Sequence, residues 1–405
     1  FPNKVLSYAD HLDSMDLKSI FLPIKAYQFH CDIIEKHIAL RGKKSKFDNF
    51  SSLNINQTNE MFKNISFFFQ NDRKSFLSKK EKKYLNNIIQ LPVAKDPISK
   101  GNLVDINKIS YLRTNHNQNK IYNFDFKKNY IAKKKIKKFE IINYQNVKHL
   151  KIGLFIACRL KSSRLKNKAI LKLTNKHTLI EKCILSSKKI KSADIIAITT
   201  SKNSEDFILN KFCKKHKIEF FQGSGDNVVK RYLDAAKKFK IDVIIRVTGD
   251  CPEISNEIVE ILLKSFSKTN ADYTVAKNCP IGFGAEIIKV SALRSIFEKK
   301  PDLSMSEYMT YYFTNNRNIF KLNFVKLPKF MTKKYRMTID YSKDLEFFRE
   351  LYKCFEEEEK EFNFKNLNFI MKKYHYINKI NSKLELSYKS DENLINKISK
   401  ASKIF

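Results

Sequence analysis

A short basic stretch directly after an apolar run has the side chains needed to hold a triphosphate. Arg159, Arg164 and Lys168 supply three spaced cations, and Ser162 adds a hydroxyl group. The charge of a triphosphate is dense and distributed, so several fixed cations and hydrogen-bond donors are needed around it. A solvated basic loop is the ordinary alternative for such a stretch. Taken alone, the stretch is moderate evidence for a phosphate site. The prediction becomes stronger when other segments supply further ligands.

Two further segments each carry an aspartate at the end of a predicted strand. Asp250 follows Gly249 after the apolar run that ends at Thr248, and Asp340 ends another predicted strand just before a helix. Mg²⁺ prefers hard anionic oxygen, so such carboxylates can hold the ion on phosphate oxygens. Helix N-capping is the alternative for an acidic residue in a loop. We predict that Asp250 and Asp340 form a magnesium site, and that Asp344 adds a cap or first-turn charge.

The elements that must position these residues alternate between strand and helix from residue 151 onward. The pattern predicts strands over 151–157, 194–199, 219–222, 242–248 and 272–276, and helices over 179–189, 205–216, 228–239 and 254–267. Such alternation is typical of an α/β fold with a largely parallel sheet. The polar loops fall just after strand C-terminal ends, which is the edge where open α/β sheets bind ligands.

Taken together, these segments resemble the cytidylyltransferases that activate sugar acids, and most closely their SpsF-like branch. The resemblance covers about residues 151–351 and is carried by five ordered segments: Arg159–Lys168, Phe221–Tyr232, Arg246–Pro252, Gly282–Glu286 and Thr338–Leu345. It implies a Rossmann-like (GT-A-like) nucleotidyltransferase domain. Such an enzyme takes CTP and a nonulosonic, sialic-acid-like sugar acid, uses Mg²⁺ and releases pyrophosphate in surface polysaccharide biosynthesis.

The resemblance also implies roles for single residues. Arg159, Ser162, Arg164 and Lys168 would hold the triphosphate; Gly223, Ser224 and Arg231 would lie near the base and ribose; Asp250 and Asp340 would bind Mg²⁺; and Glu286 would contact the substrate. Among these, Arg164, Lys168 and Asp250 are the expected catalytic residues. Catalysis would consist of positioning, charge neutralisation and in-line attack on the α-phosphate.

The phosphate loop and the base-binding motif depart from the family pattern. Lys161, Lys166 and Asn167 stand where the family has glycine and proline, and Asn227 stands where it has aspartate. Glycine permits close backbone approach to phosphate, so its loss can weaken nucleotide binding. A degenerate nucleotide-binding or scaffold module that docks a sialic acid synthase therefore remains an alternative. A nucleotide-sugar glycosyltransferase is another, although the usual D-x-D motif is missing near Asp250.

Two histidines near the N-terminus each follow a short predicted strand. His11 ends a segment that closes with Asp-His, and His37 ends a segment that closes with Glu-x-His. Imidazoles at the ends of consecutive strands can converge on one divalent metal. Most lone histidines are structural, so that explanation stays open.

These pieces resemble the end of the barrel in sialic acid synthases, followed by a SAF (antifreeze-like) domain. The matching segments are Tyr8–His11, Ile34–His37, Asp48 with Ser51–Leu53, and Ala94–Arg113. The resemblance implies condensation of phosphoenolpyruvate with an N-acetyl amino sugar. His11 and His37 would bind a metal such as Mn²⁺, and Arg113 would reach a sugar in the partner subunit.

The earlier strands of that barrel are missing from this sequence, and Ile89–Leu91 and Thr114 depart from the family pattern. A (β/α)₈ barrel builds its site from loops after many strands, so we expect synthase activity only in a longer chain. Because the sequence starts at Phe1, it looks like the C-terminal part of such a chain. The expected domains are 1–75 (barrel end), 76–148 (SAF), 149–380 (cytidylyltransferase) and 381–405 (polar tail).

Composition limits the other possibilities. The 405 residues hold 78 Lys and Arg against 42 Asp and Glu, a net charge of +36. The excess is mostly lysine spread along the chain without a nucleic-acid-binding motif, so we expect no specific nucleic acid. No apolar run suits a membrane helix. Seven cysteines without a C-x-x-C pair indicate reduced thiols in a cytoplasm, and buried side chains at Cys158 and Cys251. A homodimer or a synthase partner is implied by the two resemblances.

Overall fold

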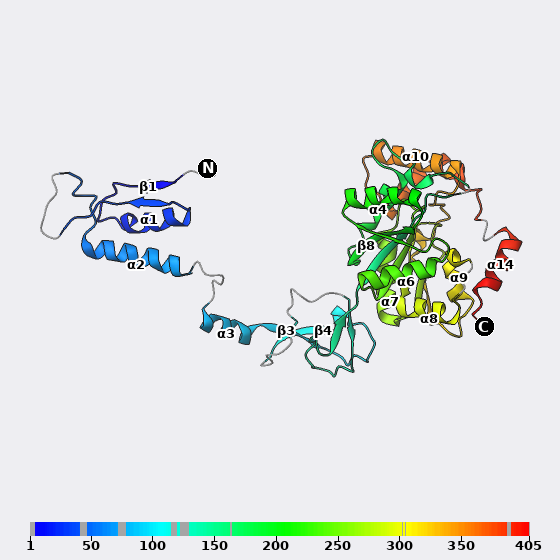
Figure 1. Cartoon of the computed structure of the whole chain (residues 1–405), viewed down its shortest axis with the longest axis horizontal. Coiled ribbons are helices and arrows are strands. Elements are labelled where there is room, and N and C mark those ends of the chain that lie inside the picture. Colours follow the sequence, from blue (N-terminus) through cyan, green and yellow to red (C-terminus); the bar gives the residue numbers. More distant parts are fainter. Residues whose placement is uncertain are drawn as a thin grey trace. The chain divides into compact units, whose positions relative to one another are not determined.

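The computed structural model describes residues 5–40, 47–71, 78–114, 120–121, 129–162, 164–301, 303, 305–386 and 390–404. Ser163 of the basic loop lies outside these residues. The chain divides into two compact units, Phe1–Ile89 and Gln90–Phe405 (Figure 1). Each unit is considered by itself below.

The first unit holds a pair of parallel strands. Its elements in chain order are β1 (Ser7–Ala9), α1 (Lys18–Gln28), β2 (Ile33–Glu35), α2 (Ile55–Asn71) and α3 (Lys79–Ile88). Parallel strands need a crossover, and α1 supplies it. The central buried cluster of this unit is small and consists of Ile20, Leu53 and Met61. Large apolar side chains such as Leu17, Phe29 and Phe67 are exposed.

The second unit begins with short antiparallel pairs. In the first, β3 (Gln90–Ala94) pairs with β4 (Ile109–Arg113); in the second, β5 (Tyr130–Ala132) pairs with β6 (Val147–His149). A 3₁₀ turn, η1 (Ile106–Lys108), precedes β4. Side chains from both pairs, including Ile109 and Tyr130, share one buried cluster.

A seven-stranded mixed sheet forms the rest of the second unit. Its strands are β7 (Ile152–Ala157), β8 (Ile195–Ser201), β9 (Glu219–Gly223), β10 (Val243–Thr248), β11 (Tyr273–Lys277), β12 (Glu286–Lys289) and β13 (Leu322–Lys326), in the spatial order β13-β11-β12-β10-β7-β8-β9. Strand β12 is antiparallel to both neighbours, and the other pairs are parallel. The strand order reverses at β7, with β8 on one side and β10 on the other. Ligands of open α/β sheets bind at such a point, beyond the carboxyl ends of the strands.

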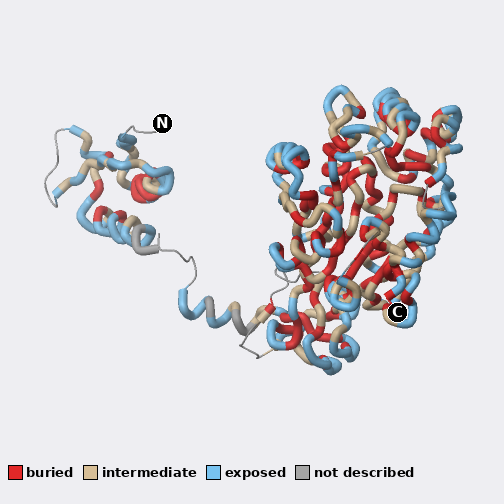
Figure 2. The backbone as a smooth tube through the Cα atoms, turned by 45° about the vertical axis from the view of Figure 1, so that its right-hand side comes forward, coloured by how far each residue is buried: buried red, intermediate tan, exposed pale blue. Residues whose placement is uncertain are grey.

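Helices cover both faces of this sheet. They are α4 (Leu179–Ser187), α5 (Leu209–His216), α6 (Val228–Phe239), α7 (Asn256–Thr269), α8 (Val290–Lys299), α9 (Met309–Thr314), α10 (Ser342–Glu357), α11 (Phe364–Lys373), α12 (Tyr376–Asn381) and α14 (Glu392–Ser402), with 3₁₀ turns η3 (Lys168–Ile170), η4 (Ser204–Ile208), η5 (Ser306–Tyr308) and η6 (Lys329–Met331). One buried cluster joins β7 and β10 to α4, α7 and α10, and a second joins the opposite face to α6, α8 and α9. Figure 2 shows the buried strands between exposed helix surfaces.

The predicted strands and helices of residues 151–276 are confirmed to within a few residues. The prediction that a strand ends at Asp340 was wrong. The extended segment makes one isolated parallel bridge, between Arg336 and Ile281, and is not a strand of the seven-stranded sheet. The N–H of Ile339 donates to the Asp250 carbonyl at 2.9 Å, which ties the segment to the loop after β10. Within the described part of the chain, no helix has the length and apolar character needed to cross a membrane.

Residues 381–405, which were expected to form a polar tail, contribute a packed helix. On α14, Ile398 is 1% exposed, whereas Ile395 is 36% exposed. The side-chain amide of Asn316, next to α9, donates to the Ser402 carbonyl at 2.8 Å and accepts from the Ile404 N–H at 3.0 Å. These contacts hold α14 against α9.

We predict that Ile398→Ala releases α14, whereas Ile395→Ala does not. Truncating a buried isoleucine costs about 2–5 kcal/mol, and the exposed residue loses little contact. Trypsin cleavage at the lysines of α14 should therefore accelerate at least about tenfold in the Ile398 variant, because cleavage follows local opening. Equal cleavage rates in the two variants would show that α14 is not held by this side chain.

Candidate functional site

The basic loop after β7 and the aspartate loop after β10 meet beyond the sheet. The Lys168 ammonium donates to Asp250 Oδ2 at 3.1 Å, to Asp340 Oδ1 at 2.9 Å and to the Ile339 carbonyl at 2.8 Å. Both carboxylates therefore converge on one nitrogen atom, whereas the sequence analysis assigned them to Mg²⁺ and Lys168 to the triphosphate. Lys168, Asp250 and Asp340 lie in three separate segments of the sequence, so they meet only because the chain folds.

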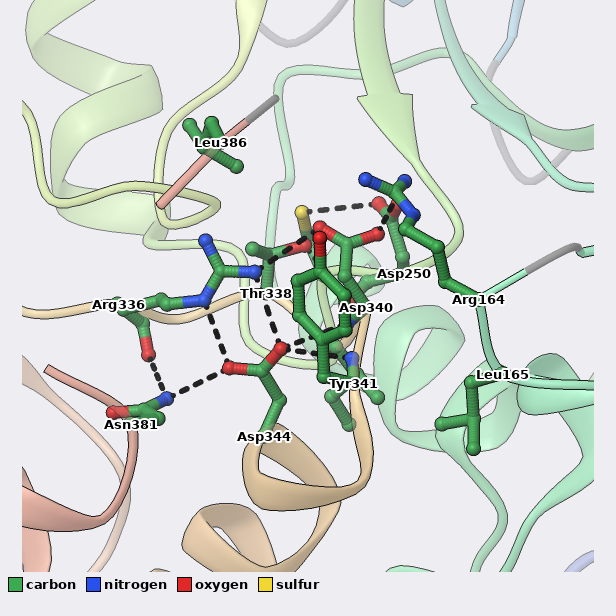
Figure 3. Close-up of polar contacts among 12 residues, drawn as sticks. Arg164, Leu165, Asp250, Arg336, Thr338, Asp340, Tyr341, Asp344, Asn381 and Leu386 are labelled. Atoms are coloured by element: carbon green, nitrogen blue, oxygen red, sulfur yellow. Dashed lines mark hydrogen bonds and ion pairs between the residues drawn. The ribbon is translucent and has the colours of Figure 1, made fainter. Parts of the chain in front are cut away.

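Two arginines complete the arrangement around Asp340. Arg164 Nη2 lies 2.8 Å from Asp340 Oδ1, and Arg336 Nη2 lies 3.2 Å from Asp340 Oδ2. Arg336 also binds Asp344 at 2.8 and 3.1 Å, while Asp344 accepts from the N–H groups of Asp340 and Tyr341. Asp344 thus acts in the first turn of α10, as predicted. Figure 3 shows Asp340 between Arg164 on one side and Arg336 on the other.

We call this group the charge cluster. It contains three carboxylates and three cations: Asp250, Asp340 and Asp344 with Arg164, Lys168 and Arg336. Asn381 of α12 braces it by donating to Asp344 Oδ1 at 3.0 Å and to the Arg336 carbonyl at 3.1 Å. The side chain of Asp340 is 5% exposed and that of Asp250 is 26% exposed, so Asp250 is the more open to a ligand.

The donor set fits a divalent ion of the Mg²⁺ type. Two carboxylates and one carbonyl oxygen already surround a single positive group, and all are hard oxygen ligands. The electrostatics agree. Burial would lower the pKa of Lys168, but the Asp250 and Asp340 carboxylates raise it above its ordinary 10.5. Burial would raise the pKa of Asp250, but Lys168 and the Thr248 hydroxyl hold it below its ordinary 3.8.

The predicted base and ribose residues form a turn at the end of β9. Arg231 is 2% exposed, and its Nη1 donates to the Ser224 carbonyl at 2.9 Å. A Cβ at position 223 would lie 2.8 Å from Phe221 Cε1 and 2.9 Å from Arg231 Cγ, so glycine is required there. Burial lowers the pKa of Arg231. Arg231 therefore holds the turn through its bond to the Ser224 carbonyl, and Gly223 and Ser224 line a pocket.

A pocket of about 480 Å³ opens beside this turn. It is lined by Arg159, Lys161, Lys202, Asn203, Phe221, Gln222, Gly223, Ser224, Gly225, Asp226, Lys230 and Asp234. Arg159 joins the pocket to the basic loop, since its Nη1 donates to the Gly225 carbonyl at 3.1 Å. The Ser162 hydroxyl accepts from the Leu165 N–H at 3.4 Å within that loop. The pocket and the basic loop thus form one continuous polar surface.

The departure at Asn227 preserves the local structure. Asn227 is the N-cap of α6, and its side chain accepts from the Lys230 N–H at 2.8 Å. Aspartate and asparagine cap helices equally well. The substitution therefore leaves the start of α6 intact beside the pocket.

Asp206 supports the basic loop and was missed by the sequence analysis. Its buried carboxylate accepts from the Leu160 N–H at 2.7 Å, from Thr200 Oγ1 at 2.9 Å and from Ser201 Oγ at 2.5 Å. These bonds fix the start of the loop to the end of β8. In the sequence, Asp206 resembles an ordinary first-turn acidic residue, because its partners lie in other segments.

Glu286, the predicted substrate residue, lies in a buried network. Its carboxylate accepts from Arg246 Nη1 at 2.5 Å, from the Tyr273 hydroxyl at 2.5 Å and from the Thr310 hydroxyl. Arg246 Nη2 donates in turn to the Glu307 carbonyl at 3.2 Å. Burial would raise the pKa of Glu286, but Arg246 and the two hydroxyls hold it below its ordinary 4.5. Glu286 therefore holds the Arg246 side chain in position.

The cysteines beside the site are buried side chains, as predicted. All seven cysteines are free thiols. Burial raises the pKa of Cys158 to about 12 and also raises that of Cys251. A Cβ at Gly249 would lie 2.7 Å from the Cβ of Cys158, so the loops after β7 and β10 touch at this point.

In the first unit, the two predicted histidines meet. His11 Nε2 and His37 Nε2 are 3.2 Å apart, and Asp48 offers a carboxylate oxygen within 4.8 Å of both rings. Two imidazoles and a carboxylate suit a borderline divalent metal. In the second unit, Arg113 is exposed at the end of β4, opposite Gln90.

We predict that Glu286→Gln destabilises the second unit at neutral pH and flattens its acid denaturation. Removing one partner leaves Arg246 buried without a counter-charge, at a cost of about 3–5 kcal/mol. Because the folded pKa is lowered, the ionised form stabilises above pH 4.5, and this stabilisation is lost as the pH falls through the lowered pKa. As the pH falls through this range, the free energy of unfolding of the wild type should decrease by up to about 1.4 kcal/mol per pH unit more than that of the variant.

Urea unfolding between pH 7 and pH 3 measures both effects. Glu356→Gln, an exposed change on α10, is the control and should behave as wild type. An acid limb of equal slope in Glu286→Gln and wild type would contradict the prediction.

Comparisons with known proteins identify the family of the second unit. The family model described as "Cytidylyltransferase" matches residues 154–380. The uncharacterized protein MJ1063 of Methanocaldococcus jannaschii is 33% identical over 208 residues, which cover 51% of this chain and 85% of that protein. The spore coat polysaccharide biosynthesis protein SpsF of Bacillus subtilis is 29% identical over 206 residues, which cover 50% of this chain and 86% of that protein.

A solved structure shows the same fold. A cytidylyltransferase from Leptospira borgpetersenii superposes with a TM-score of 0.52 at 27% identity, over 59% of this chain and 99% of that chain. The matched family region contains the charge cluster, the pocket and the sheet edge between them. The chain therefore belongs to the cytidylyltransferase family and is a nucleotidyltransferase enzyme.

Proposed function

We propose that the enzyme transfers CMP from CTP to a nonulosonic, sialic-acid-like sugar acid and releases pyrophosphate. The observation that carries this proposal is the convergence of Lys168, Asp250 and Asp340 beside the polar pocket. The similarity to SpsF favours surface polysaccharide biosynthesis as the setting. The seven free thiols suit a reducing compartment such as the cytoplasm.

The residues divide the substrate between them. We assign the cytidine to the pocket at the Gly223–Ser224 turn, and the triphosphate to Arg159, Ser162, Arg164 and Lys168. Asp250 and Asp340 would hold Mg²⁺, which supplies charge neutralisation on phosphate oxygens. The sugar hydroxyl attacks the α-phosphorus and gives its proton to solvent water. The new P–O bond forms as the bond to the β-phosphate oxygen breaks and pyrophosphate leaves with both bonding electrons.

We assign to Arg164 and Lys168 the stabilisation of the leaving group in this step. Charge builds on the leaving pyrophosphate, and fixed cations stabilise it without rearranging. We assign the sugar acid to a position near Arg246 and Glu286, on strands β10 and β12. Glu286 would then position Arg246, because its own oxygens are already bound by protein donors.

We predict that Asp250→Asn abolishes turnover without unfolding the enzyme. The amide still accepts from Lys168 but is a poor ligand for Mg²⁺, and the ion contributes several kcal/mol to transition-state stabilisation. Pyrophosphate release from CTP with a panel of nonulosonic acids should fall on the order of 10²–10³-fold. Asp391→Asn, at the exposed N-cap of α14, is the matched control and should retain the wild-type rate.

Thermal unfolding with CTP, UTP, ATP, GTP and a set of nucleotide-sugars, each with and without Mg²⁺, separates the alternatives. A ligand at 100 times its dissociation constant stabilises by about 2.7 kcal/mol. If CTP with Mg²⁺ stabilises the enzyme but no sugar acid causes pyrophosphate release, the proposed acceptor class is wrong. Stabilisation by nucleotide-sugars alone would favour a glycosyltransferase. Stabilisation by none of these ligands would leave a scaffold module.

As a second candidate function, we propose that residues 1–148 derive from a sialic acid synthase and dock a synthase partner or a second copy of the chain. The 3.2 Å approach of His11 and His37, with Asp48 nearby, favours this origin. The domain assignment of 1–75 to a barrel end and 76–148 to a SAF domain belongs to this proposal. Arg113 would contact the sugar of the partner.

We predict that His37→Ala removes one Mn²⁺ site from the chain. Imidazole contributes strongly to such a site, so its loss should weaken binding by about tenfold or more. His30→Asn is the control, because His30 is exposed with φ of 60° and asparagine tolerates that conformation. Isothermal titration with Mn²⁺ tests the pair. Equal Mn²⁺ binding by both variants would show that His37 does not bind the metal.

A further inference from the structure

Lys168 occupies the point between the two carboxylates. An ammonium group has three donors, and the three oxygens of Asp250, Asp340 and Ile339 at 2.8–3.1 Å use all of them. Asp340 Oδ1 also accepts from Arg164 at 2.8 Å. The oxygen atoms assigned to a divalent ion are therefore already bound by a cation that belongs to the protein.

The charge cluster is electrically balanced in this state. Three carboxylates face three cations, and most of their side chains are buried or half-buried. A divalent ion that entered alone would leave two uncompensated positive charges in a largely buried site, which is costly. A nucleoside triphosphate brings the negative charge that restores the balance. The cluster therefore disfavours the metal alone and accepts the metal with its nucleotide.

The local backbone allows Lys168 to change partners. Lys168 begins the short turn η3 directly after Asn167, which has φ of 54°. Its four-carbon stem lets the ammonium rotate away from the carboxylates while the backbone of η3 stays packed through the buried Ala169. Phosphate oxygens offer an ammonium the same charge-assisted bonds that the carboxylates provide.

We infer that Lys168 excludes divalent cations from the nucleotide-free enzyme and yields their position only to a metal that arrives with a triphosphate. The inference rests on the proposed function, because it takes the incoming ligand to be a nucleoside triphosphate. Lys168 thus has two partners in turn, the carboxylates before binding and the phosphates afterwards. Metal binding and nucleotide binding are then strongly coupled.

Titration of the full chain with Mn²⁺ alone tests this inference. The electron paramagnetic resonance signal of free Mn²⁺ reports binding without any turnover. Lys168→Met should gain one additional Mn²⁺ site per chain, with affinity at least about tenfold above that of wild type, because a competing positive charge is removed. Lys166→Met is the matched control: it removes the same charge from an exposed position in the same loop, and it should show no gain.

Further variants identify the site. Adding Asp340→Asn to Lys168→Met should abolish the gain, whereas Lys168→Arg should retain the exclusion. The histidines of the first unit are present in every variant, so their binding cancels in the comparison. Lys168→Gln provides a second neutral variant that keeps a donor to the carboxylates, should Lys168→Met fail to fold.

The inference is overturned if wild type and both neutral variants bind Mn²⁺ equally without nucleotide. That result would leave the proposed function standing as long as CTP with Mg²⁺ stabilises the wild type. If no nucleotide stabilises the wild type, the proposed function fails instead, and the Mn²⁺ titration still reports whether Lys168 excludes the ion.

Discussion

The ion pairs of Lys168 with Asp250 and Asp340 join three segments that are far apart in the sequence. Each segment leaves the sheet or its edge at a different place, and the ammonium draws them together beyond the point where the strand order reverses. The buried apolar clusters hold the strands in register and also anchor these loops, since Leu160, Ala169 and Ile339 lie in the larger cluster. The charge cluster then fixes how closely the loops approach one another, because it pairs Arg164 and Lys168 with the aspartates of the other segments.

Support for this arrangement comes from behind the loops. Asp206 fixes the start of the basic loop, Arg231 holds the Gly223–Ser224 turn, and Asn381 binds Asp344. Each of these side chains is buried and bonds to backbone groups or to another charged residue. Rigid second-layer contacts of this kind hold reacting groups in place at no cost during the reaction.

The sequence predicted the central sheet well, because its strands are rich in Val and Ile and its loops follow at regular intervals. It also predicted that Arg164, Lys168, Asp250 and Asp340 would share a site, and the structure brings them together. It could not predict that Lys168 binds the carboxylates directly, since this depends on the loop conformation at Asn167. The contacts of Asp206 and the pairing of Arg246 with Glu286 across β10 and β12 arise only from tertiary structure. The sequence analysis did not predict the last helix, α14, because the segment is rich in polar residues.

The contact between Gly249 and Cys158 limits how the two loops can move. The two positions belong to different loops, yet a Cβ at 249 would lie 2.7 Å from the Cβ of Cys158. Any residue at 249 other than glycine would therefore need a shift of the loop that carries Asp250, because every residue at 158 except glycine keeps that Cβ. The missing side chain at 249 thus sets the spacing between the basic loop and the aspartate loop.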